Sequence, residues 1–164
     1  MPLDFAEDLR HTVAKMADAL AAIPDDAASR RPAPDKWSAK EIMGHLIDSA
    51  ANNHARFVRA QVQDTFVFLG YGQDDWVAVQ QYQRASWPDL LALWREYNLH
   101  IARIMDATSP DIRLRERHPH NLHEIAWQPI PVDQPATLDY MMRDYVGHLH
   151  HHLNQIQDVL GARR

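Results

Sequence analysis

The segment from Asp144 to Ile156 reads DYVGHLHHHLNQI, and its apolar residues recur at steps of three or four positions. The full apolar stripe consists of Leu138, Met142, Tyr145, Leu149, Leu153, Ile156 and Leu160. This period is that of a helix that buries one face. Thr137 can serve as its N-cap and Gly161 follows its last turn, so the sequence predicts a long helix over residues 137–160.

Upstream of this segment, three other stretches show the same helical period. They span residues 3–23, 38–63 and 86–108. The second begins at a capping box, in which the Ser38 hydroxyl can accept a first-turn N–H while Glu41 reaches back to the start of the helix. The third has Pro88 in its first turn, where proline breaks no backbone hydrogen bond. Four long helices joined by shorter connections are typical of a helix bundle.

The connections between these helices are rich in proline and glycine. Residues 24–37 read as an extended connection, and residues 64–75 read as a loop before a short helix over 76–84. Residues 110–136 are too long for an inert loop, so we expect a short hairpin or a cover over one end of the bundle. The predicted fold class is all-α: an antiparallel four-helix bundle with a long cover segment before the last helix, in one domain spanning residues 1–164.

The composition is close to that of an average globular protein, with 46% hydrophobic and 24% charged residues over 164 positions. The net charge is −5 and the arginines are scattered among acids, which argues against a nucleic-acid binder. The one dense basic stretch, residues 113–117, reads as a solvated strand or loop edge. The sequence shows no apolar run of membrane-spanning length, no signal peptide and no cysteine. We therefore expect a cytoplasmic protein whose partner is a small molecule, not nucleic acid or a membrane.

Histidine is the exceptional residue of this sequence, with 11 copies. His148 and His152 are four residues apart in the last predicted helix, so their side chains leave one face about a turn apart. Two imidazoles at that spacing can bind one metal ion. A buried histidine that hydrogen-bonds to a neighbour is the simpler explanation of such a pair, and a third ligand from another helix would favour the metal.

His45, in the second predicted helix, is the candidate third ligand, because Asp48 follows it one turn later. A histidine ligand with a carboxylate beside it is an arrangement that metal sites use. Asp48 could accept the free N–H of His45 or act as a catalytic base near the ion; an exposed helix acid is the alternative. Three further residues are candidate substrate contacts by their spacing from these histidines: Asn52, Arg56 and Gln155. Ordinary solvent-facing positions are the alternative for these three.

Several blocks of the sequence resemble signatures of the DinB/YfiT-like proteins. Residues 37–49 (WSAKEIMGHLIDS) resemble the second-helix signature that ends in His-x-x-Asp-Ser, and residues 145–156 resemble the last-helix signature with its His-x-x-x-His pair. The loop LGYGQDDW at 69–76 and the His-Pro pair at 118–119 also resemble features of that family. Gly147 is a departure, because these relatives tend to have Trp just before the first His of the pair.

The resemblance implies a bundle that carries one divalent metal ion, nickel or zinc, on His45, His148 and His152. It also implies a metal-dependent hydrolase or a transferase of low-molecular-weight thiols such as bacillithiol or mycothiol, often as a homodimer. Three imidazoles leave a coordination position open, where an ion can lower the pKa of water for hydrolysis or bind a thiol as thiolate. We expect thiol transfer slightly ahead of hydrolysis.

Two hypotheses from other classes stay open. One is a stress-associated metal-binding bundle without turnover, and the other is a haem bundle with histidine ligands from facing helices. Trp76, Trp87 and Trp94 are expected in the core, and the sequence predicts no role for His118, His120 and His123.

Overall fold

The computed structural model describes residues 1–161, and the regular secondary structure in that range is all helical, with isolated bridges but no extended strand. The four long helices are α1 (Asp4–Ala21), α3 (Ala39–Val62), α5 (Trp87–Ala107) and α8 (Leu138–Gly161). The short ones are α2 (Asp25–Ser29), α4 (Gln73–Gln80), the 3-10 turn η1 (Tyr82–Arg84), α6 (Pro110–Arg113) and α7 (Leu122–Ile125). The predicted all-α four-helix bundle is confirmed. Residues 162–164 of the expected domain lie outside the described residues.

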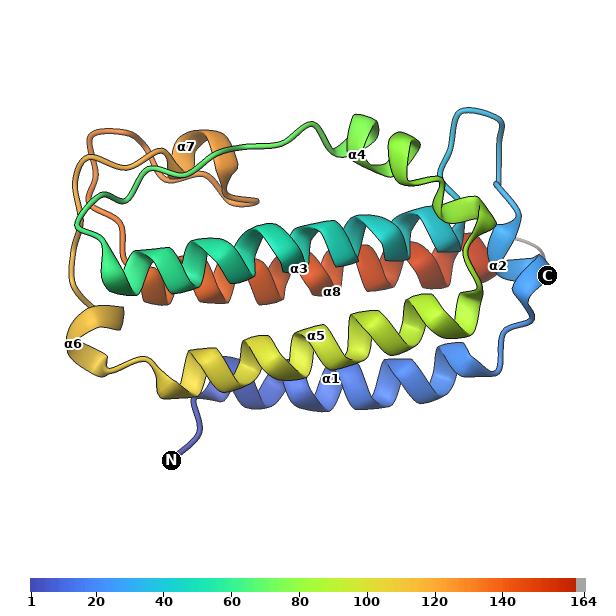
Figure 1. Ribbon diagram of the computed structural model, residues 1–164, viewed down its shortest axis with the longest axis horizontal. Helices are drawn as coiled ribbons and strands as arrows, with labels where there is room; N and C mark the ends of the chain where they lie inside the picture. Colours follow the sequence, from blue (N-terminus) through green and yellow to red (C-terminus); the bar gives the residue numbers. More distant parts are fainter. Residues whose placement is uncertain (162–164) are drawn as a thin grey trace.

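The connections decide how the four long helices run relative to one another. α3 packs on both α5 and α8, and α1 packs on the other sides of the same two helices. The segment after α3 returns along the whole bundle before α5 begins, so α3 and α5 run in the same direction (Figure 1). α1 lies antiparallel to α5, and α3 lies antiparallel to α8 (Figure 1). Each long helix therefore has one antiparallel and one parallel neighbour, so the predicted antiparallel arrangement holds for two of the four neighbouring pairs.

Helix boundaries follow the capping residues that the sequence offers. Ser38 caps α3 through a complete capping box with Glu41, and the Ser86 hydroxyl accepts the Asp89 N–H at the start of α5. The Tyr140 N–H donates to the Thr137 hydroxyl at the start of α8. These contacts satisfy first-turn N–H groups that have no partner inside the helix. The three corresponding predicted helices are confirmed.

The core lies between the four long helices and continues under the connecting segments. Its largest fully buried side chains include Trp87, Trp94, Phe57, Ile42 and Leu46. Trp76 does not belong to the core, because 38% of it is exposed on α4 and its ring lies 5.0 Å from that of Tyr71. The prediction that Trp76 is a core residue was therefore wrong.

Three connections differ from the sequence-based expectations. The stretch 24–37 contains the helix α2. Pro24 is its N-cap residue, a position where a proline removes no hydrogen bond of the helix. The short helix expected over 76–84 begins earlier, at Gln73, and is broken at Gln81, whose φ of 52° is left-handed. The segment 110–136 holds two short helices and no hairpin.

The segment 110–136 covers the bundle at the end of α3, as one of the two alternatives expected. Arg117 anchors it: its guanidinium donates to the carbonyls of Ala60 and Gln63, at 2.7 and 3.2 Å, and so caps the end of α3. This arginine is 5% exposed, so the interpretation of the Arg-rich stretch as a solvated edge was wrong there. The imidazoles of His118 and His120 lie 2.9 and 2.6 Å from backbone carbonyls near the end of the same segment.

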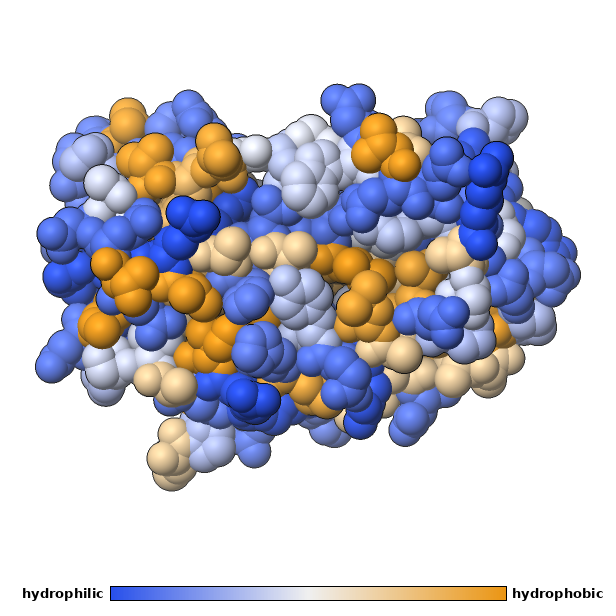
Figure 2. All heavy atoms as spheres, in the orientation of Figure 1, coloured by the Kyte–Doolittle hydropathy of each residue, from blue (hydrophilic) through white to orange (hydrophobic). Residues whose placement is uncertain are grey.

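The visible surface mixes hydrophobic and hydrophilic side chains without large uniform areas (Figure 2). Its outline is indented between the parts of the molecule over α7 and over α4 (Figure 2). None of the described helices has the length and apolar character needed to span a membrane.

Candidate metal centre

Three histidines from two helices converge between α3 and α8. They are His45, His148 and His152, whose candidate ligand nitrogens all lie within 4.8 Å of one another. Nε2 of His45 lies 3.3 Å from Nε2 of His148. The His152 ring centroid is 4.5 Å from that of each of the other two rings. Three nitrogens this close can share one ion, because metal–imidazole bonds are about 2.0–2.1 Å long.

The local sequence places each ring where the two helices face one another. His45 follows the buried residues Ile42 and Met43 in the first half of α3, and it is 1% exposed. His148 and His152 flank the buried Leu149 in the middle of α8, and both are partly buried. Because α3 and α8 pack directly on each other, an i,i+4 pair on one meets a single ring from the other.

The environment keeps these rings neutral, as metal ligands must be. Burial, with a smaller contribution from repulsion by His152, lowers the pKa of His45 to about 3. Burial, followed by repulsion from the other rings, lowers the pKa of His148 to about 3. Burial also lowers the pKa of His152, although its bond to Gln155 opposes this shift. A neutral imidazole has a lone pair to offer a cation.

The second nitrogen of two rings has a polar neighbour that orients the ring. Nδ1 of His152 lies 2.7 Å from Oε1 of Gln155, which can accept its proton and leave Nε2 for a metal ion. Nδ1 of His148 lies 3.4 Å from the Ser49 hydroxyl. Nδ1 of His45 is buried and has no partner among the described residues. The donor set, the neutral rings and this fixed orientation fit a divalent ion.

Asp48 lies one turn after His45 but is held by other groups. Its Oδ1 accepts hydrogen bonds from the Tyr82 hydroxyl at 2.6 Å and the Gln80 amide at 2.8 Å. Its Oδ2 is buried and, within residues 1–161, makes no hydrogen bond, so it does not accept a proton from His45. Burial raises the pKa of Asp48 despite these two bonds. A catalytic role for Asp48 stays a prediction.

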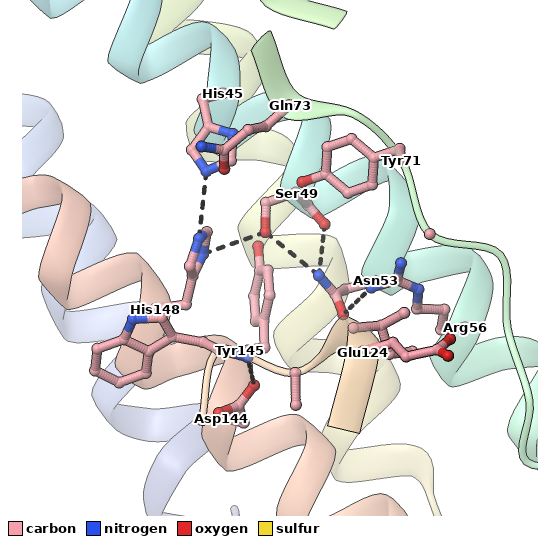
Figure 3. A pocket seen from close by; sticks show the side chains of 14 residues that line it. His45, Ser49, Asn53, Arg56, Tyr71, Gln73, Glu124, Asp144, Tyr145 and His148 are labelled. Carbon is pink, nitrogen blue, oxygen red and sulfur yellow. Dashed lines mark hydrogen bonds between the residues drawn. The ribbon is translucent and has the colours of Figure 1, made fainter. Parts of the chain in front are cut away.

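A cavity of about 380 Å³ opens beside His45 and His148 (Figure 3). Four of its wall residues lie along α3 and three along α8, and the others come from residues 70–73, at the start of α4, and residues 124–127, at the end of α7. The wall consists of His45, Ser49, Asn53, Arg56, Gly70, Tyr71, Gln73, Glu124, Ile125, Ala126, Trp127, Asp144, Tyr145 and His148. Its size is in the range of small-molecule sites, about 300–1,000 Å³.

The candidate substrate contacts divide between this cavity and other places. Arg56 lines the cavity, and Asn53 lines it in place of the predicted Asn52. Asn52 turns its amide to the Asp48 carbonyl and faces a separate groove. Gln155 contacts His152 and is not part of the cavity wall. Their roles toward a substrate stay predictions.

Trp127 is a wall residue that sequence reasoning missed. It lies in the cover segment, with its backbone N–H bonded to Asp144 at 2.8 Å and its ring centroid 5.6 Å from that of His151. Its indole also lies against Gly147, so close that a Cβ at that position would be 2.8 Å from Cζ3. An indole from the cover segment therefore fills the space that a side chain at position 147 would take. No local pattern signals this contact.

Comparisons with known proteins agree with this architecture. The sequence profile described as the DinB superfamily matches residues 8–156. YfiT of Bacillus subtilis, described as a candidate metal-dependent hydrolase, is 23% identical over 152 residues, which cover 92% of this chain and 79% of YfiT.

The solved structure of YfiT is described as a four-helix bundle of unusual topology. It superposes with a TM-score of 0.77 at 21% identity, over 94% of this chain and 83% of that one, which shows a shared fold. The profile match extends over most of the residues that build the bundle. The chain belongs to the DinB superfamily.

Proposed function

We propose that this protein is a metal-dependent enzyme that hydrolyses a small molecule, with one divalent ion on His45, His148 and His152. The observation that carries the proposal is the convergence of these three neutral imidazoles, two of which, His45 and His148, line a cavity of about 380 Å³. Three protein ligands and an adjoining cavity are the arrangement of catalytic metal sites, whereas structural sites are closed by a fourth protein ligand. The description of YfiT as a candidate metal-dependent hydrolase supports the same reaction class.

The residues of the chain have separate tasks in this proposal. A bound ion would act as a Lewis acid and would lower the pKa of a water or thiol in its open position. Gln155 fixes the ring of His152, and Ser49 lies beside His148, so both orient ligands. Trp127 and Tyr71 line the cavity and limit the access of solvent to a bound substrate. Nickel and zinc are the proposed ions, because both accept imidazole.

Transfer of a low-molecular-weight thiol is the second candidate reaction. It is favoured because, within residues 1–161, the carboxylates of Asp48 and Asp144 both accept hydrogen bonds from other groups of the protein. Asp144 accepts the backbone N–H groups of Trp127 and Gln128, and Asp48 is bonded to Tyr82 and Gln80. A thiol ionises more readily than water and has less need of a protein base. Location in the cytoplasm and assembly as a homodimer stay predictions.

Elemental analysis and a substrate panel test the proposal together. We expect about one divalent ion per chain in the purified protein and its loss in His148→Ala, because that change removes one of three ligands. The metal-loaded protein is then assayed with chromogenic esters and amides, and with bacillithiol, mycothiol or glutathione plus a chromogenic electrophile. Cleavage without a thiol supports hydrolysis, and turnover only with a thiol moves the reaction to transfer. Metal binding without either activity would favour the metal-binding bundle without turnover.

The hypothesis of a haem-binding bundle is tested by absorption spectroscopy. Addition of haem to the metal-free protein would produce a shifted Soret band if histidines from facing helices bound the iron. No shift is expected, because the three rings already lie within contact distance of one another and leave no room for a porphyrin between α3 and α8.

A further inference from the structure

One face of α3 carries a row of polar residues that leads away from the three histidines. His45, Ser49, Asn53 and Arg56 all line the same cavity. His45 and Arg56 are separated by 11 positions, which is close to three turns, so both side chains leave the same side of the helix. At about 1.5 Å per residue, their Cα atoms lie about 16 Å apart along the helix axis. The row therefore joins two distant ends of one cavity (Figure 3).

Arg56 is a buried cation without an acidic partner. It is 6% exposed, and its guanidinium donates to the Leu69 carbonyl at 2.8 Å and to Oδ1 of Asn53 at 3.5 Å. Both acceptors are neutral, and none of the ion pairs among residues 1–161 involves Arg56. Burial without a counter-ion is costly for a charge. These two contacts leave further N–H groups of the guanidinium for another acceptor.

The two acids in the cavity wall do not neutralise this charge. Asp144 accepts the backbone N–H groups of Trp127 and Gln128 at 2.8 and 2.7 Å. Glu124 is exposed, and its carboxylate lies 3.4 Å from the imidazole of His123. Within residues 1–161 the other charged groups lie outside the wall, so an anion that pairs with Arg56 has to enter with a ligand.

We propose that the substrate is an extended small molecule with a carboxylate at one end, and that Arg56 binds this carboxylate while the reacting group lies at the three histidines. This inference rests on the proposed metal-dependent function and adds the class of substrate to it. A planar guanidinium pairs with a carboxylate through two parallel hydrogen bonds, which fixes the direction in which the molecule lies. Asn53 and Ser49 lie between the two ends, where they are bonded to each other, to Arg56 and to His148.

The separation of the two ends restricts the ligand. A molecule that meets only the metal ion, such as acetate, cannot also reach Arg56 across three helical turns. A molecule with two functional groups on a chain can do so, and it would gain a charge-assisted hydrogen bond at the far end. Such bonds to a charged group are worth more than neutral ones, and about a tenfold gain in affinity is expected.

Binding of hydroxamates with a carboxylate tail tests the proposal without an assay of activity. A hydroxamate chelates zinc or nickel, so the probes are ω-carboxyalkyl hydroxamates of increasing chain length and their methyl esters. Titration calorimetry on the zinc-loaded protein gives the Kd of each acid and ester. We expect one chain length at which the acid binds about tenfold tighter than its ester, because only the acid pairs with Arg56.

Two variants with the same change of charge separate this effect from a general one. Arg56→Met should make acid and ester bind equally, with the affinity for the ester retained. Arg59→Met should keep the wild-type preference, because Arg59 is exposed and does not line the cavity beside the histidines, although it borders a neighbouring groove that Arg56 also lines. If Arg56→Met does not fold, the acid–ester comparison on the wild type and on Arg59→Met still decides whether the carboxylate adds affinity and whether Arg59 is its partner.

The outcomes distinguish the substrate class from the metal site. Equal binding of acid and ester at every length, or a preference that survives in Arg56→Met, would overturn the carboxylate proposal and leave the metal site standing. Failure of both probes to bind to protein incubated with zinc would overturn the proposed function and this inference with it. A preference that disappears only in Arg56→Met supports both.

Discussion

The ring of Tyr82 packs against the backbone of Gly44 so closely that no Cβ fits between them. The same side chain donates a 2.6 Å hydrogen bond to Asp48, one turn further along α3. The 3-10 turn η1 is thus fixed to α3 next to His45, the histidine of the candidate metal centre that comes from this helix. Tyr82, which lies in the connection between α3 and α5, thus contacts α3 on both sides of His45.

Gly44→Ala is expected to destabilise the protein by about 2 kcal/mol or more, because Tyr82 has to move and Asp48 then loses its shortest hydrogen bond. Urea denaturation measures this loss. Gly161→Ala is the matched control, because a Cβ there meets nothing within 4 Å. It should be neutral or slightly stabilising, as alanine has the higher helix propensity. Equal stability of Gly44→Ala and the wild type would contradict the close packing.

Gln155→Ala should weaken metal binding without removing a ligand. Its side-chain oxygen is the acceptor that orients the His152 ring, and loss of such a contact costs about 10- to 100-fold in affinity. Competition with a chromogenic chelator gives the Kd for zinc. Asn154→Ala, at the exposed neighbouring position, should bind zinc as the wild type does. If the two variants have the same Kd, Gln155 does not position His152.

Metal should stabilise the folded protein, because the unfolded chain does not hold the three rings together. At a free zinc concentration about 100-fold above Kd, we expect a gain of about 2.7 kcal/mol in the free energy of unfolding. His152→Ala should lose this gain. His150→Ala should retain it, because His150 lies on the same helix but its ring faces Asp8 on α1, at 2.9 Å. Thermal unfolding with and without a chelator provides the measurement.

Acid should destabilise the metal-free protein at pH values above those at which most carboxylates become protonated. The pKa values of His45 and His148 are lowered to about 3 from an ordinary value of 6.5. Below pH 6.5 the unfolded chain therefore binds protons that the folded protein does not, and the free energy of unfolding falls as the pH decreases toward 3. From about pH 7.5 to about pH 5.5 we expect a loss of about 1 kcal/mol for each ring. In urea denaturation, an undiminished loss in His148→Leu would contradict this assignment.

Local chemistry accounts for the parts of the structure that the sequence predicts. The capping box at Ser38 and the proline after Ser86 determine where α3 and α5 begin, since they act within one helical turn. The i,i+4 spacing places His148 and His152 on one face for the same reason. For His45 the sequence offered only Asp48 one turn later and the family resemblance, because the packing that brings α3 to α8 involves residues about 100 positions apart.

The remaining features depend on contacts that no local pattern contains. Arg117 caps a helix that ends 55 positions earlier, and Trp127 finds its place because Gly147 has no side chain. The row from Ser49 to Arg56 could equally have faced solvent, since a polar stripe has the same spacing in either case. Only residues 70–73 and 124–127, which cover this row as a roof, make it the wall of a cavity.

The two ends of the cavity are both formed by α3, and this has a consequence for which substitutions can change the ligand. Because His45 and Arg56 belong to the same helix, the distance between their Cα atoms is set by the helix rise, and substitutions at single positions cannot lengthen it. The roof is made of loops, which tolerate insertions and replacements far better than a packed helix does. In this chain we therefore expect the length of an acceptable ligand to depend on α3, while substitutions in the loops that contain Tyr71 and Trp127 change the width and polarity that the cavity accepts.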